Sequence, residues 1–323
     1  MRGKGWVRAV AIAAIGGVAL TGCSNSDSGS SGRSENDKIT VVTSTNVYSD
    51  IVKSIAGDNV KVEPIINSTS QDPHSYEATA QDRLKAKDAD LIVENGGGYD
   101  AFMEDISEGS DAKKIDAVEL SGLPGAGEAG GHDHDHDSDS GHEHDHDHGS
   151  FNEHVWYNPK VMETVSKKIS DELGSLDSDH KDDYSKREQE LGDKLGKLQE
   201  RASSLKGDGR QYLATEPVPG YLLQAAGLKD ATPQDFYEAI EGDTDAPASV
   251  IKSLKDELDS GNIALLGFNS QTESSQTQDV KKYAEDHNVS TVSFTETLPD
   301  DQDYVGWMNM NLDNISSALD SQS

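Results

Sequence analysis

Histidine, the side chain that proteins most often use to bind transition metals, is concentrated in one short stretch of this chain. Seven of the eleven histidines lie between residues 132 and 148, where they are interspersed with seven acidic residues. Such a loop can bind a borderline metal such as zinc, but weakly, because ordering it costs backbone entropy. The sequence therefore predicts an auxiliary, low-affinity metal loop formed by His132, His134, His136, His142, His144, His146 and His148.

Two histidines outside this loop are the better candidates for a specific site. His74 lies in the segment Gln71-Asp72-Pro73-His74-Ser75-Tyr76, after an expected strand, and His154 lies just before an expected helix. Open α/β sheets bind ligands at the carboxyl ends of their strands. We expect both histidines to lie at such junctions, beside the histidine-rich loop.

One stretch formally matches the zinc-protease pattern H-E-x-x-H, namely residues 142–146. That pattern needs a stable helix to place both histidines on one face, and the flanking residues here are Asp, Gly and Ser. A secreted zinc hydrolase is therefore a weaker alternative than a binding protein.

Strand and helix patterns alternate along the rest of the chain. Short β-branched or aliphatic runs at 39–44, 60–66 and 91–93, and later at 211–215, 262–268 and 289–295, alternate with helical patterns. This order predicts an α/β fold with two Rossmann-like lobes, each a mainly parallel sheet flanked by helices. An apolar stripe over 178–206 predicts one long helix that joins the lobes and resists bending.

The expected domains follow from these patterns. We predict an N-terminal lobe over 38–177, a linking helix over 178–206 and a C-terminal lobe over 207–323. The stretch 125–150 is rich in Gly, Asp and His and has almost no apolar residue, so we expect a mobile loop there.

The first residues resemble a lipoprotein leader. A positive segment with Arg2, Lys4 and Arg8 precedes a short apolar run, and Leu20-Thr21-Gly22-Cys23 resembles the lipobox of bacterial lipoproteins. The resemblance implies a signal peptide over 1–22 and a lipid on Cys23, followed by a Ser- and Gly-rich tether to residue 37. We therefore expect a protein on the outer face of the cell membrane, held there by its lipid alone.

The charge of the chain excludes one class of partner. Sixty acidic residues against 28 lysines and arginines give a formal charge of −32. Binding to nucleic acid requires clustered cations, so nucleic acid is excluded as a partner.

A family resemblance connects these features. The segments Asp72-Pro73-His74-Ser75-Tyr76-Glu77 and Ala89-Asp90-Leu91-Ile92-Val93-Glu94-Asn95-Gly96 resemble the first-lobe signature of the zinc- and manganese-binding solute-binding lipoproteins of ABC importers. In that family one metal ion lies between two lobes joined by a rigid helix. The resemblance implies that His74 and His154 are the first two ligands.

The resemblance also implies two carboxylate ligands from the second lobe. Glu216, in Thr215-Glu216-Pro217-Val218-Pro219-Gly220-Tyr221, stands where zinc members most often have His and resembles the manganese members. Glu296 stands where Asp is more usual, and Asp300 or Asp301 is a nearby rival. Two imidazoles and two carboxylates suit Zn²⁺, and bidentate carboxylates would suit Mn²⁺ or Fe²⁺.

We therefore expect a monomeric extracytoplasmic protein, not an enzyme, that captures Zn²⁺ and delivers it to the permease and ATPase subunits of an ABC importer. The alternatives are a manganese- or iron-binding protein of the same kind and a metal-binding surface adhesin. The fold alone would not separate these roles.

Overall fold

Two buried aliphatic strands form the centres of two parallel sheets in the computed structural model of this chain. Residues 38–129 and 151–321 are described, so Cys23, the expected signal peptide and tether, and the seven loop histidines lie outside the described residues. The chain from Lys38 onward forms one compact unit.

The first sheet has the strand order β2-β1-β3-β4, and all of its pairings are parallel. The strands are β1 (Ile39–Thr45), β2 (Val60–Ile66), β3 (Leu91–Glu94) and β4 (Lys113–Asp116). The second sheet repeats this arrangement in the order β6-β5-β7-β8, again parallel throughout. Its strands are β5 (Gln211–Ala214), β6 (Lys229–Asp230), β7 (Ile263–Asn269) and β8 (Thr291–Phe294). In each sheet the strand order reverses beside the first strand, which is where such folds form ligand crevices.

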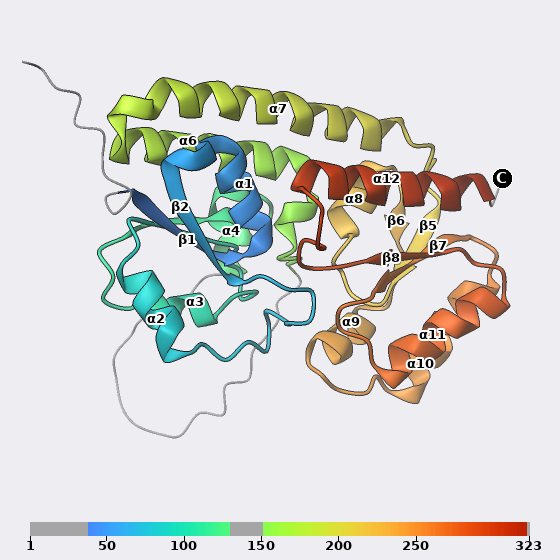
Figure 1. The fold of residues 1–323 in the computed structure, drawn as a ribbon. Coiled ribbons are helices and arrows are strands. Elements are labelled where there is room, and N and C mark those ends of the chain that lie inside the picture. The colour runs from blue at the N-terminus through green and yellow to red at the C-terminus, as the bar shows by residue number, and fades with distance from the viewer. Residues whose placement is uncertain (1–37, 130–150, 322–323) are drawn as a thin grey trace, which may run out of the picture. The chain divides into compact units, whose positions relative to one another are not determined.

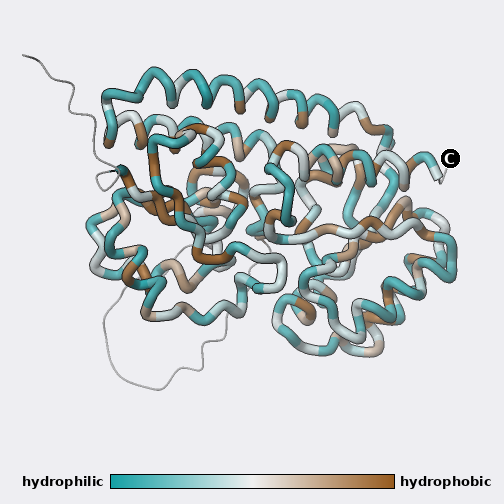
Figure 2. The backbone as a smooth tube through the Cα atoms, viewed as in Figure 1, coloured by the Kyte–Doolittle hydropathy of each residue, from teal (hydrophilic) through white to brown (hydrophobic). Residues whose placement is uncertain are grey.

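Helices cover the sheets, and for this reason the central strands are apolar on both faces. All seven residues of β7 are buried, and Figure 2 shows hydrophobic residues gathered along the strands. The helices around the first sheet are α1 (Asn46–Ala56), α2 (Ala80–Lys87), α3 (Phe102–Ser107), α4 (Ala117–Ser121), α5 (Ala126–Ala129) and α6 (Pro159–Leu176). Those around the second sheet are α8 (Gly220–Ala225), α9 (Gln234–Glu241), α10 (Ala248–Asp259), α11 (Ser275–Asp286) and α12 (Tyr304–Ser321). We call the part built on the first sheet, residues 38–177, lobe one, and residues 207–321 lobe two.

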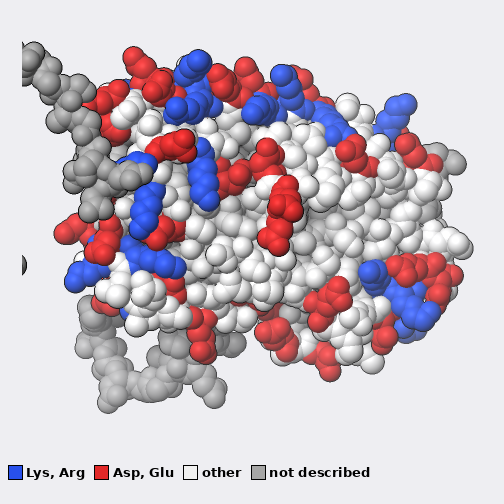
Figure 3. All heavy atoms as spheres, viewed as in Figure 1, with Lys and Arg blue, Asp and Glu red and all other residues white. Residues whose placement is uncertain are grey.

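Helix α7 (Lys181–Ser204) lies along both lobes (Figure 1). It packs against α1 and α6 of lobe one and against α8 and α12 of lobe two. Leu191, Leu195 and Leu198 are buried on its inner face, in a hydrophobic cluster that includes Ile51 of α1 and Trp307 of α12. The two lobes therefore share one continuous core beneath α7. On the outer side of α7, basic and acidic side chains alternate along the edge seen in Figure 3.

The expected fold class is confirmed, with differences in detail. The long helix is shorter than expected, because residues 178–180 form a 3₁₀ turn (Ser178–His180) before α7 begins. The expected loop over 125–150 contains a short helix, α5, at its start. Strand β4 and helix α9 were not expected, because their short or mixed patterns are weak in the sequence. No helix within the described residues is both long and apolar enough to cross a membrane.

Hydrogen bonds join the lobes in the centre of the molecule. The Asn46 side chain donates to the Leu298 carbonyl at 2.7 Å and accepts from the Leu298 amide at 2.9 Å. The buried hydroxyl of Tyr304, on α12, donates to the Trp156 carbonyl of lobe one at 2.6 Å. These bonds satisfy buried or partly buried backbone groups between the lobes, so they fix one lobe against the other.

The Tyr304 hydroxyl should contribute measurably to stability. In Tyr304→Phe the buried Trp156 carbonyl loses its described donor, so the free energy of unfolding should fall by about 1–3 kcal/mol. Tyr283→Phe is the matched control, because its hydroxyl binds Asp259 at the surface. Urea denaturation of both variants checks this, and equal stability of the two would contradict it.

Candidate metal centre

The side chains that the sequence indicates lie together between the lobes. His74 lies in the loop between β2 and α2, and His154 immediately precedes the 3₁₀ turn Val155–Tyr157. Glu216 and Glu296 each lie two residues beyond the end of a strand, β5 and β8 respectively. Three of the four thus follow strands as expected, whereas in the described segment 151–153 no strand precedes His154.

His154 is held with one ring nitrogen available. The Asn152 side-chain oxygen accepts from the His154 backbone amide at 3.0 Å and lies 2.8 Å from Nδ1, while the Asn152 amide nitrogen donates to the Pro217 carbonyl. Nδ1 therefore carries the proton, and Nε2 keeps its lone pair. Nε2 is buried and has no hydrogen-bond partner in the part of the chain that the structure describes. Burial lowers the pKa of His154 to about 4, so the imidazole is neutral at physiological pH and ready to bind a metal.

His74 faces His154 across the site. Their ring centroids are 5.9 Å apart. Asp72 accepts from the His74 backbone amide at 2.9 Å, and the same carboxylate oxygen lies 3.4 Å from Nδ1. Nε2 lies 3.1 Å from a carboxylate oxygen of Glu153. Burial lowers the pKa of His74, but its hydrogen bonds to Asp72 and Glu153 outweigh burial and raise that pKa well above its ordinary value.

The two glutamates of lobe two are linked by one amide. The Asn269 side-chain nitrogen lies 2.8 Å from Glu216 Oε2 and 2.7 Å from Glu296 Oε1, and the Thr272 hydroxyl donates to Glu216 Oε1. Glu296 Oε2 is buried 3.7 Å from His74 Nδ1, and no described residue forms a hydrogen bond with it. Burial raises the pKa of both carboxyls, and the charge of Glu296 helps to raise that of Glu216 to about 8.

These donors form two overlapping groups that could hold a metal ion. His74, Glu153 and His154 form one, and Asp72, His74 and Glu296 form the other, with the ligand atoms of each group within 4.8 Å of one another. Glu216 belongs to neither group and is connected to them through Asn269. Among the described residues, His154 Nε2 and Glu296 Oε2 are buried and have no hydrogen-bond partner. An imidazole nitrogen with a lone pair and a carboxylate oxygen are the donors that a divalent transition metal requires.

Comparison with known proteins identifies the family. The sequence matches the family model described as zinc-uptake complex component A, periplasmic, over residues 41–318. The chain belongs to this family. The family resemblance predicted from the sequence motifs, to solute-binding components of metal ABC importers, is thereby confirmed.

Similar proteins are named for different metals. The manganese ABC transporter substrate-binding lipoprotein PsaA of Streptococcus pneumoniae is 27% identical over 321 residues, covering 93% of this chain and 94% of that protein. The iron ABC transporter substrate-binding lipoprotein MtsA of Streptococcus pyogenes serotype M1 is 26% identical over 302 residues, covering 88% and 90%. The fold resembles that of the periplasmic zinc binding protein TroA from Treponema pallidum, with a TM-score of 0.68 at 22% identity, covering 87% of this chain and 99% of that one.

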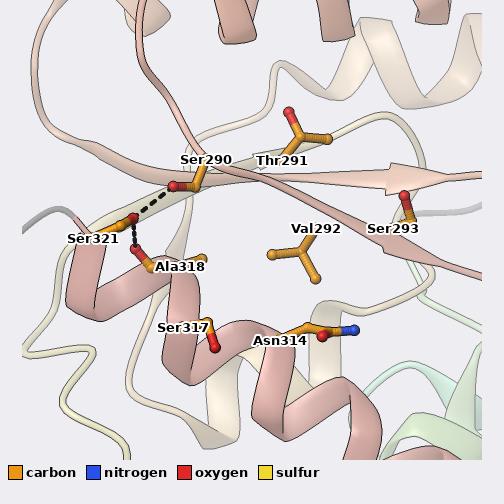
Figure 4. A pocket seen from close by; sticks show the side chains of 8 residues that line it. All are labelled: Ser290, Thr291, Val292, Ser293, Asn314, Ser317, Ala318 and Ser321. Atoms are coloured by element: carbon orange, nitrogen blue, oxygen red, sulfur yellow. Dashed lines mark hydrogen bonds between the residues drawn. The ribbon is translucent and has the colours of Figure 1, made fainter.

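Within the zinc-uptake component A fold, the rival carboxylates of the fourth position lie away from the site. Asp300 and Asp301 are exposed, whereas Glu296 is fully buried beside His74. The cavity in Figure 4, of about 470 Å³, is also remote from the site because it lies at the amino end of β8, against α12. Its lining includes Ser290, Thr291, Asn314 and Ser321 and no charged side chain.

Sequence reasoning missed two acidic groups of this site. Glu153 precedes His154 directly and contacts His74, and its position beside a candidate ligand was the available signal. Glu241, at the end of α9, has a buried carboxylate oxygen without a hydrogen-bond partner. Burial, followed by the charge of Glu153, raises the pKa of Glu241 to about 9. The end of an amphipathic helix usually lies in solvent, so the burial of Glu241 could not be predicted from the sequence.

Metal affinity should fall with falling pH. The pKa of Glu216, raised to about 8, means that this carboxyl holds a proton at pH 7 that a metal must displace, and the raised pKa of His74 acts in the same direction. Below pH 8 the affinity should therefore fall by about tenfold per pH unit for each proton displaced. Calorimetric titration with Zn²⁺ from pH 8 to pH 5, in buffers of different ionisation enthalpy, gives both the affinity and the number of protons released. An affinity that is constant between pH 7.5 and pH 5 would contradict this.

Proposed function

We propose that this protein captures a divalent transition metal outside the cytoplasmic membrane and delivers it to the permease and ATPase of an ABC importer. Zn²⁺ is the first candidate for this metal. Membership of the zinc-uptake component A family supports the transport role. The lipobox-like sequence that ends at Cys23, and the lipoprotein names of the relatives, support attachment to the membrane through a lipid.

One observation carries this proposal. Two donor atoms from different lobes, His154 Nε2 and Glu296 Oε2, are buried near His74 and have no hydrogen-bond partner among the described residues. A buried polar atom without a partner costs about 1–3 kcal/mol, and more when it is charged. A divalent cation between the lobes satisfies both atoms at once, so we assign His74, His154, Glu216 and Glu296 as its ligands.

The four assigned ligands support Zn²⁺ as the bound ion, and one of them supports a second candidate ion. Two imidazoles and two monodentate carboxylates form a tetrahedral set typical of zinc, and zinc binds such sites more tightly than manganese or iron. Glu216, in place of a third nitrogen donor, supports Mn²⁺ or Fe²⁺ as the second candidate. The manganese and iron names of PsaA and MtsA agree with that alternative.

Release of the metal requires the ligands of the two lobes to separate. Because the lobes share a core beneath α7, we expect the ligand loops to move rather than the whole lobes. Gln271 joins the two loops concerned. Its amide nitrogen donates to the Gln71 carbonyl at 2.8 Å, and its oxygen accepts from the amides of Glu296 and Thr297. We propose that the permease displaces the His74 loop by breaking this connection.

Removal of either histidine should abolish tight binding. Substitution of a residue that only hydrogen-bonds to a metal ligand lowers metal affinity by about 10–100-fold. Removal of a ligand itself should have a larger effect, so His74→Ala and His154→Ala should each lower Zn²⁺ affinity by more than about 100-fold. Competition titration with a fluorescent zinc chelator measures the effect.

His287→Ala is the matched control, because this histidine lies at the surface and stacks on Tyr283. Its affinity should equal that of the wild type. Tight one-to-one binding that survives both His74→Ala and His154→Ala would refute the proposed site.

The histidine-rich loop should be dispensable for the specific site. Deletion of residues 132–148 should leave one tight equivalent of zinc and remove only weaker additional equivalents, because none of the four assigned ligands lies in the loop. Native mass spectrometry of the two proteins at increasing zinc counts the equivalents. Loss of the tight equivalent on deletion would show that the loop supplies a ligand.

A further inference from the structure

Glu153 is a buried carboxylate that none of the assignments above uses. Its side chain is 8% exposed, and its oxygen Oε1 lies 3.1 Å from Nε2 of His74. Among the described residues no lysine or arginine forms an ion pair with it, and its recorded ion-pair partner is His74. A buried carboxylate needs a cationic partner, because the desolvation of an unpaired charge is costly.

The orientation of the two imidazoles decides where a cation must lie. Asn152 holds Nδ1 of His154 and so leaves Nε2 of that ring for a metal, whereas Nε2 of His74 faces the Glu153 carboxylate at 3.1 Å. His74, Glu153 and His154 each offer one ligand atom within 4.8 Å of the other two, so a cation held by the two imidazoles lies among these three side chains. The Glu153 carboxylate is therefore adjacent to the cation.

The alternative role for Glu153 is that of a counter-ion only. Paired with a protonated His74, the carboxylate would occupy the position of the metal and would compete with it. Two observations favour a ligand. His154, the next residue, places its unpartnered Nε2 in the same group of ligand atoms, and among the described residues no lysine or arginine pairs with the carboxylate.

We propose that Glu153 is a fifth ligand of the captured ion and that it sets the balance between zinc and manganese at this site. This inference rests on the proposed function. A third carboxylate raises the coordination number and adds a hard oxygen donor, and both changes favour Mn²⁺ and Fe²⁺ over tetrahedral Zn²⁺. With Glu153 as a ligand, a site with only two imidazoles can bind a harder ion such as Mn²⁺ and still bind Zn²⁺.

Glu153→Gln tests the proposal, because it keeps the shape of the side chain and removes its charge. Mn²⁺ affinity should fall by about tenfold or more, Zn²⁺ affinity should fall by less, and the ratio of zinc to manganese affinity should rise. Titrations with MnCl₂ and with ZnCl₂ on wild type and variant give that ratio. A Mn²⁺ affinity that is unchanged or increased would overturn the proposal and identify Glu153 as a counter-ion.

Glu188→Gln is the matched control. Glu188 is a buried glutamate of α7, and its charged neighbours are Lys167, Glu163 and Asp171. This variant should leave both affinities unchanged. If wild type binds neither metal, the proposed function fails. If wild type binds both and Glu153→Gln behaves as Glu188→Gln does, only the role of Glu153 fails.

A second measurement does not depend on how the variant folds. In a crystal structure of the wild-type protein grown with MnCl₂, a Glu153 oxygen should be bonded to the ion together with Nε2 of His74 and of His154. A Glu153 carboxylate turned away from a bound ion would overturn the proposal.

Discussion

The site depends on the burial of several carboxyl groups beside two imidazoles, with no lysine or arginine to neutralise them among the described residues. Within residues 38–129 and 151–321, Asp72, Glu153 and Glu296 have only His74 as an ion-pair partner. The pKa of Glu216 is raised to about 8 and that of Glu241 to about 9, because burial and mutual repulsion disfavour their charged forms. Protons or a divalent cation must supply the missing positive charge. Metal capture and its pH dependence are thus two results of the same electrostatic constraint.

The scaffold supports this constraint by keeping the lobes in place. The continuous core beneath α7 and the hydrogen bonds of Asn46 and Tyr304 hold the lobes at a fixed separation. Amide side chains then position the ligands. Asn152 sets the tautomer of His154, and Asn269 holds Glu216 and Glu296 together. Neutral amides suit this role, because they orient charged ligands without competing with the metal for them.

Much of the fold was predictable, because β1 and β2 are rich in β-branched residues and β7 is an apolar run that suits a strand buried on both faces. His74 and His154 were predictable because they stand in recognisable motifs at element boundaries. Glu153 and Glu241 were not singled out, since a glutamate beside a histidine or at a helix end is usually solvated. The boundary of α7 was also misjudged, because the apolar stripe of a helix does not mark where a 3₁₀ turn replaces its first turn.

The sequence by itself determined the two α/β lobes, the family and the pair of histidines, because hydrophobic period and motif spacing are local properties of the chain. Only the tertiary structure decided which acidic groups share the site with those histidines. The sequence contains 60 acidic residues, and residue type alone does not show which of them are buried in the site. Burial and proximity distinguish them, and both arise from contacts between segments far apart in the chain. Asn269, which reaches Glu216 from 53 residues away, is one such contact.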